Sequence, residues 1–355
     1  MRTHFSFRLP TVAVYGATLF FLLALTLHES SAAPYYEGKT ITIVRGGTPG
    51  GTGERQARTV VPFLKKYIPG SPSIVVLHMP GAAGRKAANY VYQGRRKDIT
   101  LAAIGGGLAV GPILGLPGVK YDINKLNYLG STESGTPYLF YTRKEAGLDS
   151  LEKLRSASVV KVGGQTVGHP IYYSARMIAY ILGLKNQKYV TGYSGREMDL
   201  AVLRGEIDGR TNNATTLLRR NPEWLERDMI NLHVTITVPK GKFHPRFKDV
   251  PAVDNFAKTD MDRKLLSMFR ALLYPRWPFF LAPGAPKESV SILQEAFRKT
   301  FQDPEFMKYF EKMMGAEASP LNAEEVKQAI AAIPSDPEVL ALFKALAGPG
   351  PIPSR

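Results

Sequence analysis

Short apolar runs alternate with amphipathic segments along the chain, and this alternation predicts the fold class. The apolar runs are rich in β-branched residues and have the length of strands; they cover 40–44, 73–78, 99–104, 158–163 and 233–238. The segments between them carry apolar residues at helical spacing and stop at or near Gly or Pro; the clearest are 53–67, 169–183 and 196–205. Strands that alternate with helices are typical of mostly parallel sheets flanked by helices.

The strands fall into two successive α/β units without an internal repeat, which we interpret as two similar lobes. At 355 residues the chain is long enough for two domains. Toward the C-terminus, Val290 and Phe297 share one helical face, and Asn322 with Glu325 fits a capping arrangement at the start of another helix. The Gly- and Pro-rich end, 347–355, is expected to be a disordered tail.

The first residues have the pattern of an export signal. Arg2 and Arg8 precede an apolar stretch at 12–27, and small residues follow up to Ala32, where we expect cleavage. An uncleaved membrane anchor is the alternative, but the apolar stretch is shorter than the ~20 residues that span a bilayer. We therefore expect residues 1–32 to be a cleavable signal peptide and the mature protein to be periplasmic.

The composition limits the kinds of partner that the protein can bind. The chain has no cysteine, which excludes disulfides, thiolate metal sites and a lipid-bearing cysteine after the signal. With 46 Lys and Arg against 30 Asp and Glu, the formal net charge is +16, which favours anionic ligands or surfaces. The basic residues are spread along the chain, and we interpret the densest run, 95–97, as a solvated loop rather than a nucleic-acid site. No nucleic-acid partner, cofactor or metal is expected.

A glycine-rich turn follows the first predicted strand and opens the first predicted helix. It reads GGTPGGTG, residues 46–53. Glycines permit close approach of the backbone, and the unpaired N–H groups of a helix start attract an anion. The turn lacks the Gly-Lys-Ser/Thr of a nucleotide-binding P-loop, and its spacing fits a dinucleotide fingerprint poorly. A structural turn that binds nothing is the alternative, and Glu54 is expected to cap the helix rather than contact a ligand.

Three further turns repeat the pattern of strand, turn and helix. The second, 78–90, carries small residues that let its helix pack close to the sheet, so we expect a structural role. The third, 162–176, presents glycines and a threonine that suit an anionic group, as the first turn does. The fourth, 190–209, contains Tyr193 and Ser194 directly before a helix.

The fourth turn nearly matches the G-x-S-x-G nucleophile elbow of hydrolases, but Arg196 stands where the last glycine belongs. A hydrolase also needs a base, and no histidine is spaced to pair with Ser194 or with an acid. The histidines show no metal-ligand spacing either. We expect no catalytic residue, and an exported enzyme is the less favoured alternative.

Five motifs, taken in order behind the export signal, resemble the substrate-binding proteins of tripartite tricarboxylate transporters, the Bug-type periplasmic solute receptors. The motifs are PGGTGERQAR, PGAAG, GGQTVGHP, GYSGREMDLAVLRGEIDG and PFFLAPGAPKESVSILQEAFRKTFQDPEF. The resemblance covers nearly the whole mature chain. It implies a two-lobed receptor that closes on a small ligand, usually a carboxylate, and delivers it to a membrane permease.

The resemblance also implies ligand-binding residues, which would hold carboxylate oxygens through amides, hydroxyls and water. Carried over by position, they are Pro49, Gly50, Gly51, Thr52 and Gly53 in one lobe and Gly163, Gly164, Gln165, Thr166 and His169 in the other. From the fourth turn we add Tyr193 and Ser194. The chain departs from the family in having Glu54 where Asp is common, and Arg45 in the approach to the first loop adds a charge near the cleft.

We therefore expect an α/β fold of the two-lobed periplasmic-binding-protein kind, type II-like, with the ligand cleft between the lobes. The first lobe comprises 34–138 and 239–355, and the second comprises 139–238. The expected function is a monomeric periplasmic receptor, not an enzyme, that captures a small mono- or dicarboxylate for a tripartite tricarboxylate-type permease. A ligand-sensing partner of a membrane sensor is the alternative that keeps the fold.

Replacement of Gly51 by Val tests the first turn as a ligand loop. A β-branched side chain there would obstruct the approach of a ligand to the backbone amides. We expect ligand binding to be lost while the circular dichroism spectrum and the unfolding midpoint stay close to those of the wild type. Unchanged affinity would remove this turn from the binding site.

Overall fold

The computed structural model describes residues 1, 3, 33–105, 107–238 and 245–355. Residues Tyr36–Arg355 form one compact unit, which holds two β-sheets. The expected signal peptide lies outside the described residues except at Met1 and Thr3, and the expected return to the first lobe at 239 also lies outside them. In the described part of the chain, none of the helices has the length and apolarity needed to span a membrane.

The first sheet has six strands in the order β11-β4-β10-β3-β1-β2. Their bounds are β1 Thr40–Arg45, β2 Ser73–His78, β3 Thr100–Ala103, β4 Asn127–Ser131, β10 Pro278–Leu281 and β11 Leu321–Asn322. β1 runs parallel to both β2 and β3, so the carboxyl ends of these three strands lie at the same edge. β10 runs antiparallel to β3 and β4, between which it inserts.

The second sheet has five strands in the order β7-β6-β8-β5-β9. Their bounds are β5 Tyr138–Arg143, β6 Val160–Gly163, β7 Gln187–Val190, β8 Gly209–Asn213 and β9 Ile230–Ile236. β6 is parallel to β7 and β8, which again gathers three carboxyl ends at one edge. β5 runs antiparallel to both β8 and β9.

The two-lobed α/β fold class is confirmed, with one correction. Both sheets are mixed rather than mostly parallel. In the first sheet, β10 inserts antiparallel to its neighbours after the chain has passed through the second sheet. In the second sheet, β5 and β9 form an antiparallel pair beside β8. The parallel strands that carry the glycine-rich turns are unaffected by this difference.

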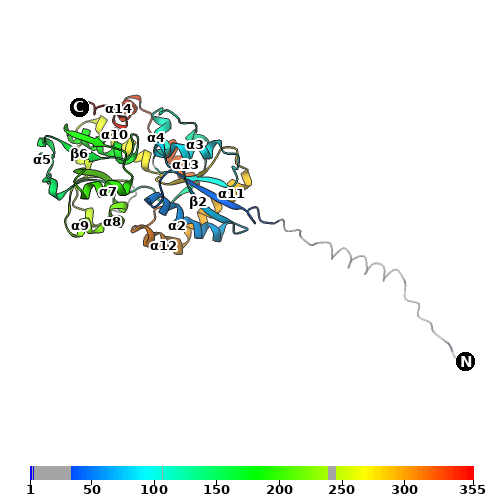
Figure 1. Cartoon of the computed structure of the whole chain (residues 1–355). Coiled ribbons are helices and arrows are strands. Elements are labelled where there is room, and N and C mark those ends of the chain that lie inside the picture. The colour runs from blue at the N-terminus through cyan, green and yellow to red at the C-terminus, as the bar shows by residue number, and fades with distance from the viewer. Residues whose placement is uncertain (2, 4–32, 106, 239–244) are drawn as a thin grey trace. The chain divides into compact units, whose positions relative to one another are not determined.

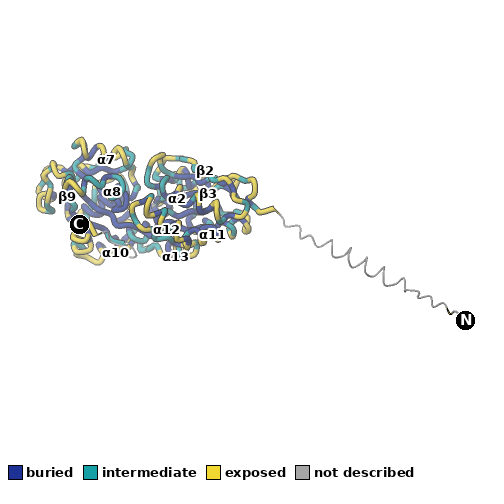
Figure 2. The backbone as a smooth tube through the Cα atoms, turned by 90° about the horizontal axis from the view of Figure 1, so that it is seen from below, coloured by how far each residue is buried: buried dark blue, intermediate teal, exposed yellow. Residues whose placement is uncertain are grey.

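Helices flank both sheets (Figure 1). Their bounds are α2 Thr52–Tyr67, α3 Arg85–Gln93, α4 Gly107–Ile113, α5 Leu151–Ser156, α6 Pro170–Leu182, α7 Gly195–Leu203, α8 Ala214–Arg220, α9 Pro222–Glu226, α10 Asp260–Leu273, α11 Lys287–Gln302, α12 Pro304–Met314, α13 Ala323–Ala331 and α14 Pro337–Ala347. α2 packs against α11 and α12, and α13 packs against β4. Figure 2 shows the buried segments inside the unit and the exposed ones around its rim.

The last helices reach the second sheet, although the sequence places everything after 239 in the first lobe. α14 packs against α6. The ring of Tyr173 on α6 lies 5.6 Å from that of Phe269 on α10 and 5.1 Å from that of Phe343 on α14. These edge contacts bury large aromatic surface, which stabilises the join between the lobes. The C-terminal segment therefore belongs partly to each lobe.

The residues after α14 make hydrogen bonds where the sequence predicts a disordered tail. The hydroxyl of Tyr172 donates to the carbonyl of Gly348 at 2.9 Å, and Arg176 Nη2 donates to the carbonyl of Gly350 at 2.6 Å. Arg355 pairs with Asp262. The tail has no regular secondary structure, but its carbonyls accept hydrogen bonds from side chains of α6. The composition of the tail alone cannot reveal these contacts.

His233 on β9 is buried and neutral. Its side chain is 5 % exposed, Nε2 lies 2.9 Å from the hydroxyl of Thr142, and the ring packs 5.5 Å from that of Phe140. Burial lowers the pKa of His233 to about 4. Below its ordinary pKa of about 6.5 the unfolded chain therefore binds a proton that the folded protein excludes, and stability falls as the pH drops toward 4.

Replacement of His233 by Leu tests this coupling. The wild type should lose up to about 3 kcal/mol more of its free energy of unfolding than H233L between pH 7 and pH 4, because only the wild type carries the buried imidazole. Urea denaturation at several pH values measures the difference. The hydroxyl of Thr142 keeps a partner in the variant, since it also donates to the carbonyl of Leu148 at 3.0 Å. Equal pH dependence in both proteins would contradict a buried neutral histidine.

Candidate functional site

One cavity of about 640 Å³ is lined by loops from both sheets. The first sheet contributes residues between 45 and 54, between 80 and 84, and at 104, 105 and 107. The second contributes residues between 165 and 171, between 192 and 197, and between 210 and 220. Apart from Arg210, which lies inside β8, these residues follow or end the parallel strands of their sheet, and ligands of open α/β sheets bind outside the carboxyl ends of such strands.

Nine of the twelve residues expected from the sequence line this cavity: Pro49, Gly51, Thr52, Gly53, Gln165, Thr166, His169, Tyr193 and Ser194. The turns of the two lobes are therefore brought together. Gly50, Gly163 and Gly164 are not part of the lining.

These three glycines shape the loops instead. A Cβ at Gly163 would lie 2.4 Å from a methyl carbon of Ile207, and one at Gly164 would lie 3.1 Å from the ring of Tyr172. Both glycines thus allow β6 and the turn after it to pack closely on their neighbours. Gly50 has φ +73°, in the left-handed region, and its N–H donates to the carboxylate of Glu54 at 2.5 Å.

Glu54 holds the start of α2, as the sequence suggests, and it also lines the cavity. Its carboxylate accepts from Gly50 N–H and from Arg58 Nε at 2.6 Å. The backbone hydrogen bond from Gly50, together with Arg58 and His78, lowers the pKa of Glu54 to about 2 against the effect of burial. Gly51 is the N-cap residue and has no side chain to cap with, so the N–H groups of the first turn remain available to a ligand.

Arg45, the last residue of β1, lines the cavity next to this helix start. It is 4 % exposed, and its Nη1 donates to the carbonyl of Ala103. Its guanidinium lies 4.9 Å from the ring centre of Trp277. Burial lowers the pKa of Arg45 to about 9, against the attraction of the Glu54 charge. The group is therefore still a cation at neutral pH.

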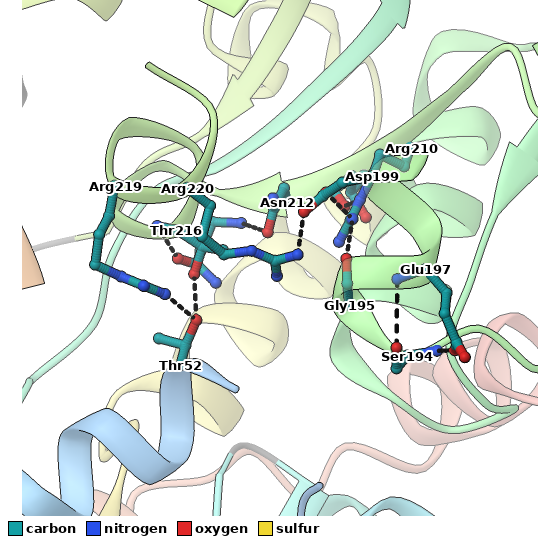
Figure 3. A network of polar contacts seen from close by, with 12 residues as sticks. Thr52, Ser194, Gly195, Glu197, Asp199, Arg210, Asn212, Thr216, Arg219 and Arg220 are labelled. Atoms are coloured by element: carbon teal, nitrogen blue, oxygen red, sulfur yellow. Dashed lines mark hydrogen bonds and ion pairs between the residues drawn. The ribbon is translucent and has the colours of Figure 1, made fainter. Parts of the chain in front are cut away.

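The lining of the second lobe is built around a buried ion-pair network, drawn in Figure 3. Arg210 Nη1 pairs with Asp199 at 2.7 Å, and Arg220 binds the other oxygen of the same carboxylate. Arg210 also donates to the carbonyl of Gly195 at 3.2 Å. One carboxylate thus fixes two arginines that come from β8 and α8 beside the cavity.

The two lobes touch beside the cavity through Thr52, also seen in Figure 3. Its hydroxyl lies 3.1 Å from that of Thr216 and accepts from Arg219 Nη2 at 2.8 Å. Thr52 starts α2 of the first lobe, whereas Thr216 and Arg219 belong to α8 of the second. Burial, with Arg55, Arg220 and Arg196 nearby, lowers the pKa of Arg219 to about 10. The predicted ligand residue Thr52 thus bridges the lobes.

Ser194 and His169 cap helices. The Ser194 hydroxyl accepts from Glu197 N–H at 3.3 Å, and Glu197 accepts from Ser194 N–H at 2.7 Å, a complete capping box. His169 Nδ1 accepts from Ile171 N–H at 3.2 Å, which leaves Nε2 to carry the proton. Burial, and then the charge of Arg210, lowers the pKa of His169 to about 3, so its ring is a neutral donor.

Several lining residues were not expected from the sequence, namely Tyr138, Arg210, Asn212, Asn213, Thr216, Arg220, Arg276 and Trp277. A signal existed for some of them: the stretch GRTNN follows a helix and a turn, as a strand should, yet it is polar throughout. A polar strand in the middle of a sheet indicates buried polar groups with specific partners, as at a binding site.

Among the described residues, no group of three or more His, Cys, Asp or Glu is placed to hold a metal ion.

Comparison with known proteins identifies the fold. The sequence matches no protein-family model and no curated protein. Among solved structures it is similar to the periplasmic binding protein BugD, with TM-score 0.69 and 16% identity over 88% of this chain and 99% of that one. It is also similar to MatC from Rhodopseudomonas palustris with bound malate, with TM-score 0.64 and 18% identity over 87% and 98%.

A third similar structure is R. palustris Rpa4515 with adipate, with TM-score 0.66 and 18% identity over 86% of this chain and 97% of that one. A TctC solute-binding protein from Polaromonas has TM-score 0.58 and 17% identity over 88% and 98%. The neighbours are thus periplasmic binding proteins of the BugD and TctC type. At these identities the likeness concerns the fold.

Replacement of Asp199 by Asn should destabilise the second lobe. Asp199 is 6 % exposed, and its loss leaves Arg210 buried without a counter-charge. We expect the free energy of unfolding to fall by about 3 kcal/mol or more, measured by urea denaturation. Asp149→Asn is the matched control, because Asp149 pairs with Lys153 on the exposed surface and its replacement should leave the stability nearly unchanged. Similar small effects in both variants would contradict a role of Asp199 in holding the arginines.

Proposed function

We propose that the protein is an exported receptor that binds a small mono- or dicarboxylate between its two lobes and delivers it to a tripartite tricarboxylate-type membrane permease. The observation that carries this proposal is the cavity of about 640 Å³, to which the carboxyl ends of both sheets contribute. Its volume lies in the range of small-molecule sites. Because each lobe supplies part of the lining, a ligand that contacts both lobes favours the closed arrangement.

The polar groups of the lining favour an anionic ligand. The first turn of α2 offers backbone N–H groups at the positive end of a helix, and His169 offers a neutral donor. Arg45, Arg196, Arg210, Arg220 and Arg276 all line the cavity. Guanidinium groups and helix N-termini both suit carboxylate oxygens.

Two of the similar structures support a carboxylate as the ligand class. MatC is a structure with bound malate, and Rpa4515 is a structure with adipate. Both ligands are small dicarboxylates. We extend this class to the present chain because its own cavity has suitable donors in each lobe, and we propose that the mature receptor acts in the periplasm as a monomer.

An exported enzyme is the main alternative from another class, and the geometry gives it little support. The Ser194 hydroxyl is used as a helix cap, and none of the hydrogen bonds of the described histidines joins one to Ser194. A nucleophile of this kind needs an adjacent base. A sensing role has the same site as a transport role, and the genes next to that of this protein would discriminate: permease subunits favour uptake, and a sensor kinase favours sensing.

A thermal unfolding series tests the carboxylate receptor. The purified protein is heated with malate, adipate, citrate or benzoate at matched ionic strength, and a ligand that binds only the folded state must raise the midpoint. We expect a saturable rise with at least one of these, equivalent to about 2.7 kcal/mol at a concentration 100 times the Kd. No rise with any of the four, in a protein that unfolds cooperatively, would contradict a carboxylate ligand.

A further inference from the structure

We propose that Arg45 is the charge-binding residue of the cleft, and that an oxyanion of the solute serves as the counter-ion which this buried guanidinium lacks within the protein. The inference rests on the proposed function, because it names the residue that would recognise the solute's charge. The resemblance of the motifs points to backbone amides for this task and leaves Arg45 outside the binding loop.

Arg45 is a buried cation without a carboxylate partner. Throughout the described ranges, no carboxylate oxygen lies within 4.0 Å of its nitrogens. Glu54 is the carboxylate whose charge acts on it, but the oxygens of Glu54 bind Gly50 N–H and Arg58 and lie 3.4 Å from His78. Arg45 Nη1 has the carbonyl of Ala103 as acceptor, whereas Nε is buried with no acceptor in the described part of the protein.

The other buried arginines of the cavity differ from Arg45 in this respect. Arg276 is 3 % exposed, lies against the same indole ring at 5.6 Å, and pairs with Glu133 at 3.2 Å. Arg210 is 1 % exposed and pairs with Asp199. Both arginines have a carboxylate partner, which offsets part of the cost of burying their charge, although Arg276 Nη1 and the Glu133 oxygen that it faces form no hydrogen bond. Arg45 is the exception among the arginines of the lining that are at least nine-tenths buried.

A buried arginine elsewhere in the fold shows how such a group is satisfied without an acid. Arg176 is 3 % exposed and lies outside the cavity lining. Its Nε and Nη2 donate to the carbonyls of Leu346, Ala345 and Gly350. Arg45 has one such carbonyl and an orphaned Nε, so part of its hydrogen-bonding capacity is unfilled, and the residue lines the cavity.

The backbone around Arg45 is fitted to its guanidinium. A Cβ at Gly53 would lie 1.5 Å from Arg45 Nη2 and 2.7 Å from the ring of Trp277, and a Cβ at Gly105 would lie 2.8 Å from that ring. Gly53 belongs to the first turn of α2. The cation therefore sits directly against the positive end of a helix, a repulsion that the charge of Glu54 offsets in part without a direct ion pair.

A second donor in the same place is also unsatisfied. The indole Nε1 of Trp277 is buried and has no acceptor among the described residues, and Trp277 lines the cavity. The attraction between the indole ring and Arg45 offsets part of the cost of burying the cation, but it uses the face of the ring and not the N–H. An oxyanion has several acceptor lone pairs, so one such group can accept from more than one donor in this part of the cavity.

Replacement of Arg45 by Met tests the inference with two readouts. The full chain is expressed with its own N-terminus, and the purified wild type, R45M and R276M are unfolded by heat with no added solute. Removal of an uncompensated charge in favour of an apolar side chain of similar size should leave the midpoint unchanged or raise it. R276M should lower the midpoint, because it leaves Glu133 buried without its partner.

The second readout is the response to anions. Wild type, R45M and the exposed-surface control R298M are titrated with malate, adipate, citrate, benzoate, phosphate and sulfate at ionic strength matched with chloride. We expect R45M to lose at least about 30-fold in affinity for the anions that raise the wild-type midpoint, and R298M to behave as the wild type. R45K keeps the positive charge but loses the planar guanidinium that can donate two parallel hydrogen bonds, so it should recover part of the affinity that R45M loses.

The outcomes separate this inference from the proposed function. If only phosphate or sulfate raises the wild-type midpoint and R45M loses the response, Arg45 is supported and the carboxylate receptor is contradicted. If carboxylates raise it equally in wild type and R45M, the receptor stands and the inference on Arg45 is overturned. A wild type that responds to none of the six anions overturns both. An R45M protein as unstable as R276M would make Arg45 a structural residue and overturn the inference as well.

Discussion

The cost of burying charge and hydrogen-bond donors where two sheets meet is the constraint on which the cleft depends. Each such group must find a partner, because an unpaired one destabilises the folded protein. Asp199 pairs with both Arg210 and Arg220, and Glu133 pairs with Arg276. Arg45 and the N–H groups at the start of α2 are left over at the carboxyl end of β1. We propose that an anionic solute supplies the missing partner. The need of buried charges and donors for partners would then both stabilise the lobes and make the cleft selective for anions.

The topology brings these groups together. The parallel strands β1, β2 and β3 end at one edge of the first sheet, and β6, β7 and β8 end at one edge of the second. The loops at both edges line the same cavity. The contact of Thr52 with Thr216 and Arg219 joins them directly beside it. A solute held by both edges would add to this contact, which is how binding can stabilise a closed form that a permease recognises.

Much of the architecture is readable from the sequence. The five predicted strands are present as β1, β2, β3, β6 and β9, since their apolar runs are strong local signals. The end of the fourth turn, 206–208, also predicts a strand after it, which is present as β8. Its polar residues are buried with partners, among them the ion pair of Arg210 and the hydrogen bonds of Thr211 and Asn213. The capping box of Ser194 and Glu197 could have been recognised from its Ser-x-x-Glu spacing, which the resemblance to a nucleophile elbow obscured.

The parts of the site that could not be predicted depend on contacts between distant segments. The glycines of the first turn predicted a ligand loop, but Gly53 proves to be fitted to Arg45 and Trp277, and Trp277 comes from the far end of the chain. Nothing local to Arg45 indicates that it is buried, because its environment is assembled from β3, α2 and the segment before β10. The C-terminal tail is held in the same way by donors on α6.

The most direct test of the account is a crystal structure of the protein with a carboxylate that raises its unfolding midpoint. If an anionic solute is the counter-ion of Arg45, the carboxylate lies inside the cavity between the lobes, with its oxygens within ~3 Å of nitrogens of Arg45 or of the first turn of α2. A carboxylate bound outside this cavity, or one held inside it by the second lobe alone with Arg45 turned away, would contradict the account.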